Sequence, residues 1–145
     1  MNGYKTILLA VDLSDEAHSV AKRAQHIAQT NGATIHLIHV IEPLSFAYGG
    51  DIPMDFSTIQ AEIQSQAKNQ LQKFAAQYQI PESCQHLVMG RAESEIHAAV
   101  GELNADLVVI GSHGRSGLSL LLGSTANSVL HGSQCDVLAV RVGKE

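Results

Sequence analysis

The sequence predicts an α/β fold in which a doubly wound parallel sheet of five strands carries helices on both faces. Short apolar runs alternate with segments of helical periodicity five times along the chain. Parallel strands need a covering crossover, usually a helix, so this alternation favours helices on both sides of one sheet. With 145 residues, 45% hydrophobic and 16% charged, the chain has enough apolar material for one sizeable core. We therefore expect a single domain, residues 1–145.

The strands are predicted from short runs of branched apolar residues, which are typical of strands buried on both faces of a parallel sheet. The first run, Ile7 to Val11, is continuously apolar. The five predicted strands cover residues 6–11, 33–41, 86–89, 106–110 and 137–140.

The first helix is predicted from apolar residues spaced three and four apart between Ala17 and Ala28. Ser14 can cap its start, a task that the side chain of Asp12 can share. Asn31 and Gly32 can end it in a left-handed turn.

Three further helices follow the same pattern. The longest starts at a possible capping box, Ser57 with Gln60, and keeps helical spacing to Tyr78, shortly before Pro81. The other two are expected over 95–103 and 125–130. The long segment 42–56 is predicted to be a lid, part of a subunit contact or a surface loop.

Charge and hydropathy exclude several classes of partner. The formal net charge is −5 and no run of Lys or Arg occurs, which argues against nucleic acid and anionic membranes. No apolar stretch approaches the roughly 20 residues that span a bilayer, and the first residues do not have the pattern of a signal peptide. We expect a cytoplasmic protein.

Cysteine and histidine give no metal or redox motif. Cys84 and Cys135 stand alone, so buried or half-buried free thiols are expected. His36 and His39 lie three residues apart on one strand and therefore on opposite faces. Five more histidines are scattered, so no metal site is predicted: His18, His26, His86, His97 and His131.

One segment carries a chemical signal: the apolar run 107–110 leads into glycines and hydroxyls ahead of a helix. Exposed backbone N–H groups in such a loop favour an anion such as phosphate. Gly111 and Gly114 could also form only the tight turn that a strand-to-helix loop uses.

Four segments resemble the universal stress protein family in sequence and in order: residues 7–14, 37–40, 106–115 and 122–124. The resemblance covers nearly the whole chain and implies the strand order 3-2-1-4-5. The order then reverses between the first and fourth strands, where Asp12 and Gly111 would face each other. In open α/β sheets, ligands bind at this reversal.

The resemblance also implies an ATP site, with or without Mg²⁺. Two sets of residues would form it. A loop around the phosphates and ribose would comprise Gly111, Ser112, His113, Gly114, Gly123, Ser124 and Thr125. The nucleoside would lie near Ala10, Val11, Asp12 and the backbone of Val40.

One departure from the family pattern leaves the function open. Eight residues, 115–122, separate Gly114 from Gly123, where nucleotide-binding members have nine. The expected function is an ATP-binding, dimeric stress-response regulator or sensor. The alternative is a homodimer that binds no nucleotide and works through protein–protein contacts.

Rapid catalysis is not expected. No Gly-Lys-Ser/Thr follows the glycines, no Ser lies in a nucleophile elbow, and no thiol has an evident histidine partner. Any ATPase activity should be slow.

The last predicted strand indicates how two copies of the chain would assemble. If residues 137–142 form an edge strand, pairing with a second copy would cover its free backbone groups. The family resemblance also implies a homodimer through this strand, and Val140→Lys should weaken that dimer.

Overall fold

The computed structural model describes residues 3–43, 56–112 and 124–141. Its five strands form one parallel sheet in the order β3-β2-β1-β4-β5. The predicted fold class and strand order are therefore confirmed. The strands are β1 (Thr6–Ala10), β2 (Thr34–Ile41), β3 (Gln85–Met89), β4 (Leu107–Gly111) and β5 (Asp136–Val140).

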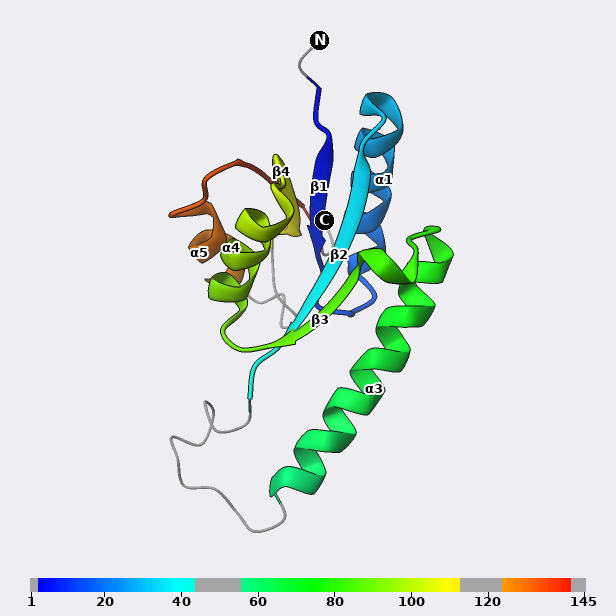
Figure 1. Ribbon diagram of the computed structural model, residues 1–145, viewed down its shortest axis with the longest axis vertical. Coiled ribbons are helices and arrows are strands. Elements are labelled where there is room, and N and C mark those ends of the chain that lie inside the picture. Colours follow the sequence, from blue (N-terminus) through cyan, green and yellow to red (C-terminus); the bar gives the residue numbers. More distant parts are fainter. Residues whose placement is uncertain (1–2, 44–55, 113–123, 142–145) are drawn as a thin grey trace.

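Helices cover both faces of the sheet, as Figure 1 shows: α1 and α3 lie on one side, and α4 and α5 on the other. A short 3₁₀ turn, η1 (Glu82–Cys84), leads into β3. The α-helices are α1 (Ala17–Asn31), α3 (Phe56–Gln77), α4 (Ala92–Leu103) and α5 (Ser124–Leu130). None of the helices in the described ranges is both long and apolar enough to cross a bilayer.

The central strand β1 explains why the sheet needs helices on both faces. Ile7 and Leu9 belong to the core on the α1 and α3 side, whereas Leu8 and Ala10 belong to the core on the α4 and α5 side. Successive side chains of a strand point to opposite faces, so a continuous apolar run can be buried only between two layers. Both cysteines are free; Cys84 is buried in the first core and Cys135 is half-buried.

The first helix starts differently from the prediction. Its N-cap residue is Glu16, without a side-chain capping bond, and the Ser14 carbonyl accepts the N–H of Ala17 at 3.0 Å. Ser14 lies two residues before this N-cap, and its hydroxyl donates to Asp12 Oδ1 at 2.7 Å. The predicted C-terminal turn is confirmed, since Gly32 is left-handed with φ 68° and its N–H bonds the Ala28 carbonyl.

Two other helix starts also differ. The longest helix begins at Phe56, so Ser57 lies within it rather than at a capping position. The next helix, α4, begins at Ala92, three residues before the predicted Glu95. The N–H of Ala92 donates to the carboxylate of Glu42 at 3.2 Å, and this distant acceptor extends the helix start.

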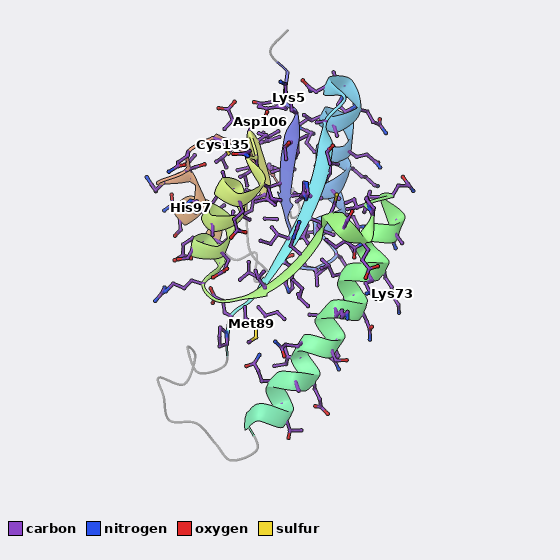
Figure 2. All side chains as sticks on the ribbon, in the orientation of Figure 1. Lys5, Lys73, Met89, His97, Asp106 and Cys135 are labelled. Carbon is purple, nitrogen blue, oxygen red and sulfur yellow. The ribbon has the colours of Figure 1, made fainter. Side chains whose placement is uncertain are left out.

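The starts of β1 and β4 are joined by one carboxylate. Asp106 accepts the backbone N–H of Lys5 at 2.9 Å and that of Thr6 at 3.1 Å. Its own N–H donates to the Thr6 carbonyl at 2.9 Å. Figure 2 shows Lys5 and Asp106 at the same end of the sheet. This arrangement fixes the register of the two central strands.

Asp106→Ala is expected to lower the free energy of unfolding by about 1–3 kcal/mol, because two N–H groups lose a charged acceptor. Urea denaturation monitored by circular dichroism measures the change. The exposed Glu102 provides the control: Glu102→Ala should change stability by less than about 0.5 kcal/mol. Equal losses in the two variants would show that Asp106 does not join the strands.

The histidines are less scattered than predicted. His36 on β2 and His86 on β3 lie close together, with His36 Nδ1 3.1 Å from His86 Nε2. Their rings stack with centroids 5.3 Å apart. Burial, followed by the charge of His86, lowers the pKa of His36.

The lowered pKa predicts acid sensitivity. The folded protein keeps His36 neutral at a pH where the same side chain in the unfolded chain, with a pKa near 6.5, already takes up a proton. The contribution to stability is therefore complete above about pH 6.5 and is lost as the pH falls below it. Urea midpoints at pH 7.5 and pH 5 should differ less for His36→Gln than for the wild type. His26→Gln, at an exposed position, should behave as the wild type does.

The edge position of β5 is confirmed, but the substitution predicted to weaken a dimer is unsuitable. Val140 is only 7% exposed and belongs to the core on the α1 side. Val140→Lys would bury a charge and destabilise the fold whether or not a dimer forms.

Candidate functional site

A cleft of about 400 Å³ opens at the carboxyl ends of β1, β2 and β4, where the strand order reverses. At such a reversal, the segments that follow two neighbouring strands run to opposite faces of the sheet, which leaves space between them. Its walls come from three strands, from the segments that follow them and from α1, α4 and α5. The lining residues are Ala10, Val11, Asp12, Ser14, Glu16, Ala17, Val20, Ile38, His39, Val40, Glu42, Ala92, Ile96, Ile110, Gly111, Thr125 and Ala126.

The cleft brings together six of the eleven residues predicted for the site. They come from segments up to 115 positions apart in the chain: Ala10, Val11, Asp12, Val40, Gly111 and Thr125. Parallel pairing of β1 with both β2 and β4 brings the ends of these strands to one edge of the sheet.

Of the other five predicted residues, Ser112 alone has a described side chain, and it is not among those that line the cleft. Ser112 is 7% exposed, and its N–H donates to the Val140 carbonyl at 2.8 Å, which extends the β4–β5 pairing. Ser124 begins α5, and its side chain lies outside the described part. His113, Gly114 and Gly123 also lie outside the described residues, as does most of segment 42–56.

Asp12 is held at the mouth of the cleft by a local turn. Its Oδ1 accepts the backbone N–H of Ser14 at 3.0 Å and the Ser14 hydroxyl at 2.7 Å. The side chain caps this turn rather than the helix α1, which begins later. The turn fixes one carboxylate oxygen of Asp12 immediately after β1.

His39 is a cleft residue that the sequence did not single out. Its Nδ1 lies 2.8 Å from the Val11 carbonyl, which can only accept, so Nδ1 carries the proton. The N–H of Val11 in turn donates to the Ile38 carbonyl at 3.1 Å. These two bonds tie the segment after β1 to β2 and so position the backbone that precedes Asp12.

The N-terminal end of α4 forms another wall. Ala92 and Ile96 line the cleft, and the Glu42 carboxylate joins the end of β2 to the first turn of this helix. Farther along, His97 Nε2 donates to the Val129 carbonyl at 3.0 Å and fastens α4 to α5. Figure 2 shows His97 on α4, beside α5. Two of the three helices that border the cleft, α4 and α5, are thus held by long-range hydrogen bonds.

The polar groups of the cleft are mostly acceptors. Three carboxylates, those of Asp12, Glu16 and Glu42, line it, and no Lys or Arg appears among its described lining residues. The floor is apolar, with Ile38, Ile96 and Ile110 all buried. A flat apolar ring with hydroxyl or amine donors at its edge fits this pattern.

This architecture defines an open, doubly wound α/β protein with a cleft at its topological switch point. The universal stress protein family model matches residues 3–141, so the chain belongs to the universal stress protein family.

Relatives match over nearly their full length. Universal stress protein A homolog 1 of Coxiella burnetii is 41% identical over 139 residues, which cover 94% of this chain and 96% of the relative. Universal stress protein G of Escherichia coli O157:H7 is 35% identical over 145 residues, with 95% and 99% covered.

Solved structures share the fold. Universal stress protein UspA from Lactobacillus plantarum superposes with a TM-score of 0.77 at 21% identity and covers 99% of this chain and 100% of its own. A universal stress protein in complex with cAMP gives a TM-score of 0.60 at 24% identity, with 97% and 98% covered.

Proposed function

We propose that this protein binds ATP in the cleft at the strand reversal and acts as a dimeric regulator or sensor of the stress-response type. The observation that carries the proposal is the cleft itself. It lies where the topology of the sheet predicts a ligand site, and six residues expected around a nucleotide line it.

The described walls fit the nucleoside end of ATP. A volume of about 400 Å³ lies within the range of small-molecule pockets, which is roughly 300–1,000 Å³. The buried isoleucines offer an apolar surface to the base, and the Asp12 carboxylate offers an acceptor to the ribose hydroxyls.

The phosphates require a different part of the chain. Three carboxylates repel a triphosphate, so the phosphates would be bound by backbone N–H groups of the glycine loop from Gly111 onward and by the hydroxyls of Ser124 and Thr125. Mg²⁺ would offset part of the phosphate charge when it is present.

Two further findings support an adenine nucleotide as ligand. The chain belongs to the universal stress protein family, and a protein with the same fold has been solved in complex with cAMP. ATP and cAMP share the adenosine moiety that the described walls would contact.

The second candidate function is a homodimer that binds no nucleotide and works through protein contacts. The spacing of eight residues between Gly114 and Gly123 favours it, because the shorter loop changes the register of the second glycine. The exposed edge of β5 would form the dimer in both cases.

Isothermal titration of the full chain with ATP distinguishes the two candidates. We expect saturable binding with one ATP per chain, competition by AMP, and an unfolding temperature that rises with ATP concentration by mass action. Folded protein that releases no heat and keeps its unfolding temperature at millimolar ATP would favour the second candidate.

A further inference from the structure

The two histidines that face each other on β2 and β3 are not among the residues that line the described cleft. β2 pairs with β3 so that Ile38 is opposite His86, which places His36 diagonally across from His86 on the same face of the sheet. His36 Nδ1 and His86 Nε2 are 3.1 Å apart. Both side chains are partly exposed, so solvent and small ions can reach them.

Apolar residues of β1, β2 and α4 lie on the same side of the sheet as this pair. Leu8 is the partner of His36 on β1 and is fully buried, and Ile38 beside it is 2% exposed. The buried face of α4 presents Ile96, Ala99 and Val100 to this side of the sheet. Apart from burial, His86 is the group that shifts the pKa of His36.

We propose that His36 and His86 form a two-nitrogen site for a late first-row divalent cation such as Zn²⁺ or Cu²⁺, with water completing the coordination. Metal–nitrogen bonds of about 2.0–2.1 Å to two nitrogens 3.1 Å apart give a nitrogen–metal–nitrogen angle of about 98°. This angle lies between the values of square-planar and tetrahedral sites, so the separation of the two nitrogens suits a shared cation, toward which the rings would turn their lone pairs.

The ligand chemistry selects the class of cation. Neutral imidazole suits Zn²⁺, Cu²⁺ and Ni²⁺, whereas Mg²⁺ and Ca²⁺ require oxygen ligands. Within the described ranges, no group of three or more His, Cys, Asp and Glu side chains could hold a metal. The site therefore has two protein ligands and open positions for water, which predicts moderate affinity.

Metal binding replaces the hydrogen bond between the rings. In the metal-free protein, one of the two facing nitrogens carries a proton and donates it to the other. On binding, that proton moves to the other nitrogen of its own ring through solvent, and both facing nitrogens donate electron pairs to the cation. No net proton is released when both rings are neutral.

The test is isothermal titration of the untagged full chain with ZnCl₂ at pH 7.5, without nucleotide. His36→Gln and His86→Gln should each weaken Zn²⁺ binding at least tenfold, because either change leaves a single imidazole. His26→Gln removes an exposed histidine on α1 and should leave the affinity within about twofold of the wild type.

A second measurement keeps the test informative if one of the two variants does not fold. Paramagnetic resonance of the protein with one equivalent of Cu²⁺ should show two nitrogen ligands in the wild type and fewer in His86→Gln, whose substitution lies on the edge strand. Wild-type Zn²⁺ affinity in both folded variants, or no change in the Cu²⁺ spectrum, would overturn the proposal. The absence of nucleotide keeps this result independent of the function proposed for the cleft.

Discussion

Gly114→Val is expected to abolish ATP binding while the fold is retained. In the proposed site, glycine at this position would let the backbone approach the phosphates closely, and a branched side chain would occupy that space. In calorimetric titrations the variant should release no heat at ATP concentrations that saturate the wild type. An affinity loss of more than a hundredfold corresponds to at least about 2.7 kcal/mol.

The matched control is Gly101→Val on α4. Gly101 is exposed, and a Cβ built there would have nothing within 4 Å, so this glycine can be replaced without a clash. The control should bind ATP as the wild type does and unfold at a similar urea concentration. If Gly114→Val binds ATP with unchanged affinity, the glycine loop does not contact the nucleotide, and the proposed site is wrong.

The sequence predicts the fold well because its signals are local. The apolar run of β1 and the three- and four-residue spacing in α1 each determine an element without reference to distant residues. Strand order is not a local property: it is expected from the family resemblance, and the structure confirms it. Helix starts are predicted less well. The acceptor for the first N–H of α4 is Glu42, fifty residues earlier, and no local pattern indicates it.

The residues of the candidate site also differ in how well the sequence predicts them. Gly111 ends β4 within a glycine-rich motif, and Asp12, two residues after β1, is implied by the family resemblance. His39 and Glu16 line the cleft only because the sheet brings the ends of β1 and β2 together. His36 and His86 are fifty residues apart, and their contact depends on a strand register that periodicity does not supply.

Ala139→Pro is expected to separate the proposed β5 homodimer into monomers without unfolding the chain. In a parallel strand, the N–H and C=O of one residue point to the same side, and successive residues alternate. The Val140 carbonyl accepts the N–H of Ser112 from the β4 side, so the N–H of Ala139 points to the open edge. Proline there removes an edge donor and leaves the β4–β5 hydrogen bonds in place.

The expected loss of dimer affinity follows from the symmetry of the dimer. A two-fold pairing of β5 strands would lose a hydrogen bond at each copy of Ala139, which corresponds to about 1–3 kcal/mol and weakens the dimer about 5- to 150-fold. Sedimentation velocity over a micromolar concentration series measures the shift. Ala139→Val keeps the N–H and should remain dimeric, and circular dichroism should show all three proteins folded. A wild-type monomer at these concentrations would rule out the dimer. Equal dimer affinities for the proline and valine variants would rule out assembly through this edge, because only the proline variant lacks the N–H that faces it.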